Sequence, residues 1–305
     1  MSWTGFRPAV VAAILTTAWL GSSRDGKGYP DPRVGSDRPL VFTGGIASKA
    51  PENPSHFRVL SFNLHGPPVR RIEALIEVLQ THPELRGASV LALQEVNRNH
   101  GESGDVAEVL ARRLGMTYAF AVEMAYRRGG GVRGVAILSR FPMDAVERVL
   151  LPHAGPGGRR RIALAATLTV GSERMRVYSL HLETRIPDSR YADQLAAVLR
   201  HAAFSRALPT LLMGDFNTTT RSRRQRMSEM VSAEGFDLPQ PQRGMTFRKL
   251  LIYFAKLDWI CARDLRIAAA GVETQAGISD HRPVWADVVL PDREVDRKVP
   301  NGGAR

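Results

Sequence analysis

Cysteine is almost absent from this chain of 305 residues, because Cys261 is the only one. A single cysteine cannot form an intramolecular disulfide, so a disulfide-dense fold is excluded, although secretion is not. Without a lipobox cysteine near the N-terminus, the sequence also argues against a bacterial lipoprotein. Apolar residues make up 44% and charged residues 24%, which is ordinary globular composition. A chain of this length can bury a sizeable core without covalent crosslinks.

Lysine is scarce as well, and it occurs only at positions 27, 49, 249, 256 and 298. Arginine therefore supplies most of the 42 basic residues, which exceed the 30 acidic ones and give a formal net charge of +12. A field of this sign attracts polyanions, either nucleic acid or an anionic membrane surface. A GC-rich coding sequence would produce the same excess of arginine, so the charge alone does not decide between these interpretations.

Long apolar runs are missing too. The apolar stretch 8–20 follows Arg7 and precedes Gly21 and two serines, and it is short for a transmembrane helix. This pattern predicts a signal peptide or N-terminal anchor in 1–23, and hence an exported protein that is secreted, periplasmic or membrane-anchored. If the segment is not a signal, the protein would be cytoplasmic. The Gly-, Pro- and Ser-rich range 24–56 predicts a disordered linker, and 292–305 predicts a disordered tail.

Between these ends, many short apolar runs alternate with a few amphipathic segments. Runs typical of strands occur at 57–62, 90–93, 118–122, 135–138, 145–150, 162–170, 175–180, 209–213, 257–261 and 283–290. Helical spacing of apolar residues occurs at 69–80, 105–114 and 190–204. Because strands outnumber helices and the helices fall in few places, the pattern indicates two sheets with helices outside rather than a regular doubly wound sheet.

Polar side chains of a few types follow these strands where each one ends or begins. They are Asn63, Glu95, His181, Asp215, Asn217, Asp258, Asp280 and His281. Any one of them has a plain alternative, since a strand-end acid is commonly a solvated turn residue and the segment 215–217 could be an Asx-turn. Acids, amides and histidines gathered at one rim of a sheet form a site, because core strands otherwise avoid such groups.

The motifs around these residues resemble, in order and spacing, those of the endonuclease/exonuclease/phosphatase superfamily. They are Ser61-Phe62-Asn63, Leu93-Gln94-Glu95-Val96, Ile137-Leu138-Ser139-Arg140-Phe141-Pro142, Ser179-Leu180-His181-Leu182-Glu183, Gly214-Asp215-Phe216-Asn217, Leu257-Asp258-Trp259-Ile260 and Ser279-Asp280-His281. The resemblance implies an α+β fold over 57–291, a four-layer αββα sandwich with two mixed β-sheets packed face to face and helices outside. It also implies a catalytic domain that hydrolyses phosphodiesters with a divalent metal ion.

The same resemblance implies a role for each polar residue. Asn63, Glu95 and Asp280 would bind Mg²⁺, with Mn²⁺ as a substitute, since Mg²⁺ prefers carboxylate and amide oxygens. Asp215 would activate the attacking water, and Asn217 would hold that water or the phosphate. His281 would act beside the scissile phosphate with Asp258 as its carboxylate partner. His181 would donate to the phosphoryl oxygens.

The substrate is less constrained, because enzymes that act on nucleic acids and on phospholipids share these motifs. Arg140, Arg160 and Arg161 are predicted to bind substrate phosphates, while the arginines at 127–128 and in 221–226 could either do so or belong to solvated loops. The apolar run 250–254 could insert into a membrane or belong to the core. Hydrolysis in nucleic acid is the leading hypothesis, a phospholipid phosphodiesterase or phosphatase is the alternative, and a non-catalytic binding module is disfavoured by the complete set of residues. No coiled coil is visible, so the chain is predicted to be a monomer.

Overall fold

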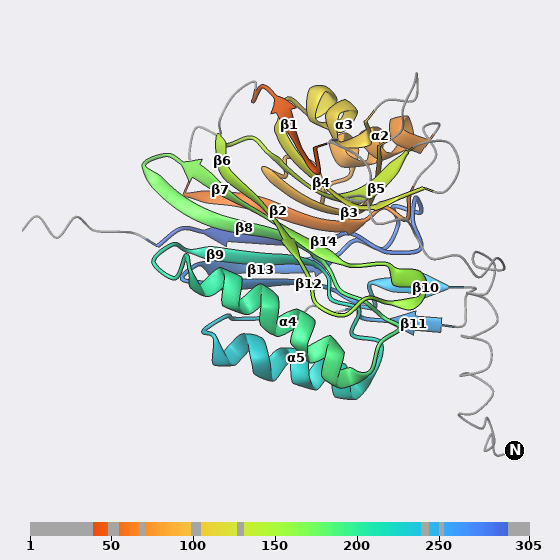
Figure 1. Ribbon diagram of the computed structural model, residues 1–305. Coiled ribbons are helices and arrows are strands. Elements are labelled where there is room, and N and C mark those ends of the chain that lie inside the picture. Colours follow the sequence, from red (N-terminus) through yellow and green to blue (C-terminus); the bar gives the residue numbers. More distant parts are fainter. Residues whose placement is uncertain are drawn as a thin grey trace, which may run out of the picture.

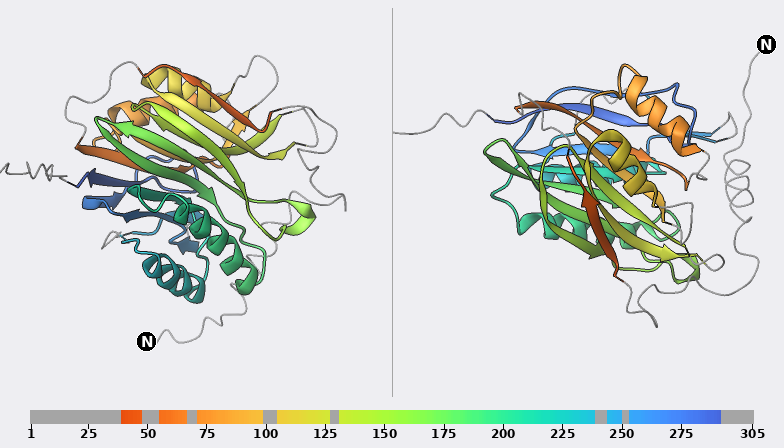
Figure 2. Two further views of the ribbon diagram at one scale, coloured as in Figure 1. Left: turned by 60° about the vertical axis from the view of Figure 1, so that its left-hand side comes forward. Right: turned by 90° about the horizontal axis from the view of Figure 1, so that it is seen from above.

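Two β-sheets pack face to face, and helices cover the outer face of each sheet (Figures 1 and 2). The computed structural model of the protein describes residues 39–47, 55–66, 71–98, 105–126, 131–238, 244–249 and 253–291. The predicted signal segment 1–23, the predicted tail 292–305 and the arginines at 127–128 lie outside these residues. Within them, no helix is both long enough and apolar enough to cross a membrane.

The two large sheets are mixed, and each contains one parallel pair of strands. The first has seven strands in the order β1 (Val41–Gly45), β4 (Thr117–Ala125), β5 (Val132–Ser139), β3 (Val90–Arg98), β2 (His56–Asn63), β14 (Val284–Val289) and β13 (Arg266–Val272). The second has five strands in the order β12 (Asp258–Arg263), β9 (Thr210–Asp215), β8 (Glu173–His181), β7 (Ile162–Val170) and β6 (Met143–Leu150). A separate hairpin joins β10 (Phe247–Lys249) to β11 (Tyr253–Ala255).

The core consists of three apolar layers that alternate with the sheets. One layer fills the space between the sheets and includes Val59, Ile137 and Leu211. A second lies under α2 (Ile72–Thr81) and α3 (Val106–Leu114), outside the first sheet. The third lies under α4 (Asp188–Ala203) and α5 (Arg221–Ala233), outside the second sheet. This arrangement confirms the predicted αββα sandwich.

Local sequence accounts for these helices. The apolar spacing of α2 buries Ile72, Leu75, Ile76 and Leu79 on one face. The predicted helix 105–114 is confirmed as α3, whose N-cap Asp105 accepts hydrogen bonds from the backbone N–H groups of residues 107 and 108. Gly115 ends this helix in the left-handed conformation, with φ 65°.

The direction of the strands places the polar residues that follow them at one edge of each sheet. β2 and β3 are parallel and connected through α2, whereas β8 and β9 are parallel and connected through α4. Parallel neighbours end at the same edge of a sheet, so each sheet presents two carboxyl ends side by side. These ends lie where the β10–β11 hairpin adjoins the sandwich (Figure 1), because Phe247 of β10 pairs with His281.

Three parts of the sequence-based prediction are corrected. Val41–Gly45 was assigned to a disordered linker, but it forms the edge strand β1 and pairs with β4. The arginine-rich segment 221–226 was considered as a loop, but it begins the helix α5. Strand β13 was not predicted, and it forms the far edge of the first sheet beside β14.

Candidate active site

The polar side chains predicted from the sequence meet at the adjoining ends of the two sheets. In the first sheet, Asn63 at the end of β2 is the register partner of Gln94 in β3. In the second sheet, Asp215 ends β9 and is the register partner of both His181 and Asp258. Asn63 Nδ2 donates to Asp215 Oδ2 at 3.0 Å and thereby links the two sheets at the centre of the site.

Asp215 is the hub of this cluster. Its Oδ2 lies 3.5 Å from His181 Nε2 and 3.8 Å from His281 Nε2. Its Oδ1 accepts a hydrogen bond from the backbone N–H of Asn217 at 2.9 Å, and Asn217 Nδ2 donates to the carbonyl oxygen of Leu182. Both residues are buried, so their orientation is fixed by the backbone rather than by solvent.

Gly214 explains why the Gly-Asp-Phe-Asn motif begins with glycine. Its φ is 151°, and a Cβ atom there would lie 2.1 Å from the carbonyl oxygen of Leu180. A larger residue would push β9 away from β8. The glycine therefore sets the distance between His181 and Asp215.

His281 and Asp258 form a buried pair. His281 Nδ1 lies 2.9 Å from Asp258 Oδ2, and the Oγ1 atom of Thr246 accepts the backbone N–H of Asp258. Burial by itself would lower the pKa of His281, but the carboxylates of Asp258, Asp215 and Asp280 outweigh burial and raise this pKa to about 10. The ring therefore carries a proton at neutral pH, with Nε2–H directed toward Asp215.

Arg161 fixes the orientation of His181. Its Nη1 lies 2.8 Å from His181 Nδ1, whereas the Oε2 atom of Glu123 lies 3.4 Å from the same nitrogen. A guanidinium can only donate, so the shorter contact makes Nδ1 an acceptor and leaves the ring proton on Nε2. That proton points into the site, toward Asp215.

A buried network of four charges supports this histidine. The carboxylates of Glu123 and Glu183 and the guanidiniums of Arg159 and Arg161 have side chains at most 2% exposed. Arg161 Nη1 donates to Glu123 at 2.6 Å, and Arg159 Nη2 donates to Glu183 at 2.7 Å. Burial would raise the pKa of Glu183, but Arg161 and Arg159 outweigh it and lower this pKa to about 2. Two negative and two positive charges thus balance each other beneath the site.

The predicted metal ligands lie at the other side of the cluster. Glu95 ends the regular part of β3 with φ 54°, and its Oε2 accepts from Arg133 Nη1 at 2.8 Å. His65 Nδ1 lies between two carboxylates, 3.8 Å from Glu95 Oε2 and 3.4 Å from Asp280 Oδ1. Burial would raise the pKa of Glu95, but Arg133 and other nearby cations lower it to about 2.

This donor set fits a hard divalent cation. Glu95 and Asp280 are both neighbours of His65, and a metal ion held by the two carboxylates would neutralise their charge. Asn63 is close by, and its Oδ1 accepts the backbone N–H of His65 at 3.0 Å. Glu95, Asp280 and Asn63 would therefore hold the ion.

A second group in the described part of the chain could also hold a metal ion. The ligand atoms of Asp215, Asp258 and His281 all lie within 4.8 Å of one another, and all three residues are buried. His281 and Asp258 bond to each other, however, and a metal ion bound to both would have to break that contact. The Glu95 group is therefore the better candidate for a resident ion.

Sequence reasoning did not assign four residues that shape the site. They are His65, Glu123, Arg133 and Glu183. Glu123 had a usable signal, since a lone acid inside the apolar strand Thr117–Ala125 is expected only where a buried partner neutralises it. Glu183 belongs to the motif 179–183, although its role as an arginine partner was not assigned, and His65 and Arg133 had no local signal.

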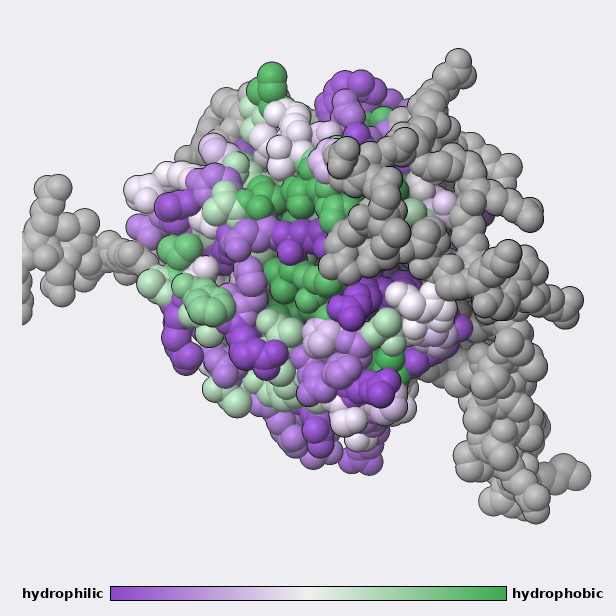
Figure 3. Space-filling model, viewed as in Figure 1, coloured by the Kyte–Doolittle hydropathy of each residue, from purple (hydrophilic) through white to green (hydrophobic). Residues whose placement is uncertain are grey.

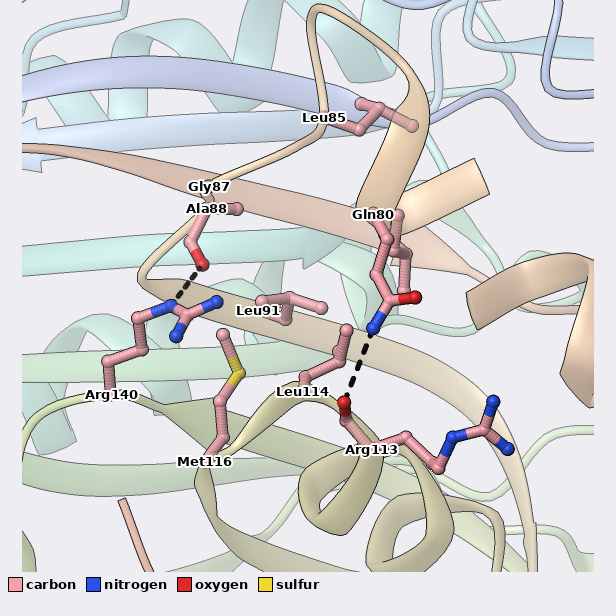
Figure 4. Close-up of a pocket in the computed structure, with 10 residues that line it drawn as sticks. Gln80, Leu85, Gly87, Ala88, Leu91, Arg113, Leu114, Met116 and Arg140 are labelled. Carbon is pink, nitrogen blue, oxygen red and sulfur yellow. Dashed lines mark hydrogen bonds between the residues drawn. The ribbon is translucent and has the colours of Figure 1, made fainter. Parts of the chain in front are cut away.

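Two of the three arginines predicted to bind substrate phosphates have other roles. Arg161 is 1% exposed and is bound by carboxylates beneath the site. Arg140 follows β5, where Ser139 pairs with Val90 at the start of β3, so it lies at the opposite end of that strand from Glu95. There it borders a cavity of about 160 Å³ between α2, α3 and β3, and its Nε donates to the Ala88 carbonyl (Figure 4).

Arg160 differs from its two neighbours, because it is exposed. It lies between the buried Arg159 and Arg161, which reach the Glu183 carboxylate behind His181. Its exposure is compatible with contact to a substrate phosphate, and that role for Arg160 stays a prediction.

Solved structures similar to this chain share its fold. An endonuclease/exonuclease/phosphatase family protein from Leptotrichia buccalis C-1013-b has a TM-score of 0.62 and 18% identity, with 75% of this chain and 98% of that chain covered. The human Nocturnin catalytic domain with bound sulfate has a TM-score of 0.59 and 19% identity, with 84% and 100% covered. D. rerio TDP2 complexed with single strand DNA product has a TM-score of 0.60 and 16% identity, with 77% and 99% covered.

The sequence itself carries the family assignment. None of the curated proteins matches this chain. The model of the Endonuclease/Exonuclease/phosphatase family matches residues 60–281, which include every catalytic and metal-binding residue predicted from the sequence. Members with this fold are typically hydrolytic phosphoester enzymes. The chain therefore belongs to the endonuclease/exonuclease/phosphatase family.

Proposed function

We propose that the protein is a divalent-metal-dependent phosphodiesterase that hydrolyses nucleic acid. The observation that carries the proposal is the convergence of His181, His281 and Asn63 on the single carboxylate of Asp215. A carboxylate beside the N–H groups of two histidines suits a reaction in which a water molecule is deprotonated while negative charge develops on a phosphoryl group.

Each residue has one chemical task in this proposal. Asp215 accepts a proton from the attacking water, and Asn217 helps to hold that water. His281 is protonated at neutral pH and donates from Nε2 to the phosphate or to the leaving oxygen, while Asp258 keeps the ring in place. His181 donates from Nε2 to a phosphoryl oxygen, and Arg161 keeps its proton on that nitrogen.

The metal ion is Mg²⁺ in this proposal, with Mn²⁺ as a substitute. Glu95, Asp280 and Asn63 would hold it. When bound, the ion would neutralise charge on the phosphate and polarise the P–O bonds. Glu95 suits this task, because a carboxylate with a pKa of about 2 is ionised throughout the physiological range.

Nucleic acid is favoured as the substrate by charge. The chain carries a formal net charge of +12, and such a field attracts a polyanion over long distances. The comparison with D. rerio TDP2, whose structure holds a single strand DNA product, shows that the same fold accommodates nucleic acid in another protein. We also propose that the chain is an exported monomer, as the N-terminal segment and the absence of a coiled-coil pattern suggest.

A phospholipid is the second candidate, and one observation favours it. Phe254 and Met245, on or next to the β10–β11 hairpin, are 44% and 46% exposed. The hairpin adjoins the site, because Phe247 packs edge-on to His281 with ring centroids 4.9 Å apart. Of the run 250–254, residues 250–252 lie outside the described part of the chain and Phe254 is exposed, so a membrane contact there is open to test.

A side-by-side hydrolysis assay of the full chain tests the proposal. Plasmid DNA, single-stranded RNA, sphingomyelin vesicles and bis(p-nitrophenyl) phosphate are each offered with Mg²⁺ and then with excess EDTA. The proposal predicts Mg²⁺-dependent cleavage of a nucleic acid and of the small diester, but not of the lipid. Cleavage of sphingomyelin alone would contradict the nucleic-acid substrate and support the second candidate. Asp215→Asn, which keeps the shape of the hub, serves as the control for contaminating nucleases.

A further inference from the structure

Positive charge gathers beside the catalytic cluster, where α5 begins and the chain enters β12. Lys256 lies two residues before Asp258, and its Nζ is 4.1 Å from the centre of the Trp259 ring. Arg224 lies in the first turn of α5. Burial and the nearby charge of Arg224 together lower the pKa of Lys256 to about 8. Thr220 caps α5 two residues after Thr218, whose hydroxyl bonds to the Lys256 carbonyl, so the two cations share this corner of the molecule.

The corner is tied rigidly to the catalytic loop through Thr218, which directly follows Asn217. Thr218 Oγ1 donates to the carbonyl oxygen of Lys256 at 2.5 Å and accepts from Trp259 Nε1 at 3.0 Å. Trp259 is only 6% exposed, so the indole ring under the lysine side chain is held in place by the residues packed around it. Any anion held there would keep a fixed position relative to the catalytic cluster.

The short connection between Lys256 and β12 places this corner within reach of the backbone phosphates of a bound nucleic-acid strand. Lys256 lies in the connection between β11 and β12, two residues before Asp258, so the Cα atoms of these two residues are at most about 7 Å apart. Successive phosphates of one nucleic-acid strand advance by about 3.4 Å along the axis of a duplex. With a phosphodiester at His281, the phosphates one or two steps away would thus lie near Lys256.

Local charge balance also favours an anion. Arg223 is neutralised by Asp188, with Nε 2.7 Å from Oδ1. Within the part of the chain that the structure describes, Arg224 has no such acidic neighbour, and the first turn of α5 contains no acidic residue. An anion bound between Arg224 and Lys256 would lower the repulsion between these two like charges. Hydrophilic residues lie among more apolar ones on the surface over α4 and α5 (Figure 3).

We propose that Lys256 and Arg224 form a phosphate-binding subsite for the nucleic-acid strand on one side of the scissile bond. This inference rests on the proposed nucleic-acid function, and it makes the enzyme selective for polynucleotides over isolated diesters. A choline phospholipid would gain nothing here, because it has one phosphate and its cationic head group would be repelled. The lysine supplies a compact point charge and the arginine a two-pronged donor, and both suit phosphate.

The test compares the full-length wild-type chain with the double variant Lys256→Met/Arg224→Gln. Methionine keeps the apolar stem over Trp259, so the packing of the corner is retained. A control double variant, Arg174→Gln/Arg206→Gln, removes the same charge at exposed positions, 174 at the start of β8 and 206 after α4. Each protein is assayed with a single-stranded oligonucleotide and with bis(p-nitrophenyl) phosphate, and oligonucleotide binding is measured in EDTA across a salt series.

The subsite predicts a loss of kcat/KM that is at least about tenfold greater for the oligonucleotide than for the small diester, as expected when a phosphate contact is worth about 1.4 kcal/mol. It also predicts that the salt dependence of oligonucleotide binding becomes shallower by about 1.4 in log–log slope, since each lost contact with a single strand removes about 0.7. The control variant should change the slope by much less. The subsite would be overturned if Lys256→Met/Arg224→Gln changed the salt slope no more than the control variant does. It would also be overturned if the double variant lost activity toward the oligonucleotide and the small diester equally.

Failure of the proposed function gives a different pattern. A wild-type chain that hydrolyses bis(p-nitrophenyl) phosphate but neither binds nor cleaves the oligonucleotide would refute the nucleic-acid substrate, and the subsite with it. A wild-type chain that binds and cleaves the oligonucleotide, with a double variant whose salt slope is unaltered, would refute the subsite alone.

Discussion

Replacing Glu183 by glutamine should destabilise the protein severely, because it unbalances the buried charge network. Glutamine keeps the shape of the side chain but leaves Arg159 and Arg161 with only Glu123 as a carboxylate partner. Glu183 is 0% exposed and accepts three hydrogen bonds from Arg159, one from Nε at 3.1 Å and two from Nη2 at 2.7 and 2.9 Å. Breaking a buried ion pair by removing one partner costs about 3–5 kcal/mol.

The electrostatics of the site give a similar magnitude. The neighbouring arginines lower the pKa of Glu183 from its ordinary value of 4.5 to about 2, and that lowering corresponds to roughly 3 kcal/mol of stabilisation of the ionised form. For a domain of this size, 1 kcal/mol shifts the melting temperature by about 2–4 °C. Glu183→Gln should therefore lower the melting temperature by roughly 6–20 °C, measured by circular dichroism.

A matched control separates burial from charge removal. Asp144→Asn breaks the ion pair with Arg174, whose two side chains are 55% and 51% exposed. An exposed pair is worth less than about 1 kcal/mol, so this variant should melt within a few degrees of the wild type. If Glu183→Gln melts at the same temperature as Asp144→Asn, the four-charge network does not stabilise the fold and the reasoning fails.

Three further outcomes are expected. The free energy of unfolding, measured in urea across a pH series, should decline as the pH falls from about 4.5 toward 2. Glu95 and Glu183 have pKa values near 2 in the folded protein, so the unfolded chain binds more protons than the folded one in that window. A constant free energy of unfolding over this range would contradict these pKa values. Asp258→Asn should lower kcat on bis(p-nitrophenyl) phosphate by about 10²–10⁴-fold, since His281 loses the carboxylate that orients and charges it, and a change of less than tenfold would exclude this pairing from catalysis. Arg133→Gln should tighten Mn²⁺ binding about tenfold by freeing Glu95 from a cation, measured by titration calorimetry without substrate; unchanged or weaker binding would show that Arg133 does not compete with the metal.

The fold and the central site were largely predictable, because their signals are local. Asn63, His181 and Asp215 each follow an apolar run, and apolar runs fix where a strand ends. That these ends lie together follows from parallel pairing, which the helices between β2 and β3 and between β8 and β9 make possible. The motif order therefore carried most of the information about the site.

The elements that were missed have weak local patterns. Strand β1 has five residues at the sheet edge, none of them buried, so neither length nor alternation marked it as a strand. Helix α5 buries only Met227 and Val231 among its apolar residues, which is too few for a clear helical stripe. Its Thr220 N-cap, which accepts the backbone N–H of Arg223, was the usable signal.

The observed positions of Arg140 and Arg161 depend on strand direction and pairing. Arg140 follows an antiparallel strand, so it emerges at the wrong end of the sheet for the site. Arg161 lies close to the site, but its guanidinium donates to the buried carboxylate of Glu123 on β4, a strand distant in the sequence. Neither the sheet order nor the partner of a buried charge is encoded near those residues in the sequence.

The most direct test of the central claim is the rate of bis(p-nitrophenyl) phosphate hydrolysis by the wild-type chain and by His281→Ala, each with Mg²⁺ and with EDTA. We expect Mg²⁺-dependent hydrolysis by the wild type, abolition by EDTA, and a loss of at least about 10²-fold in His281→Ala. Hydrolysis that persists in EDTA, or an alanine variant with the wild-type rate, would contradict the assignment of this cluster as a metal-dependent phosphodiesterase site.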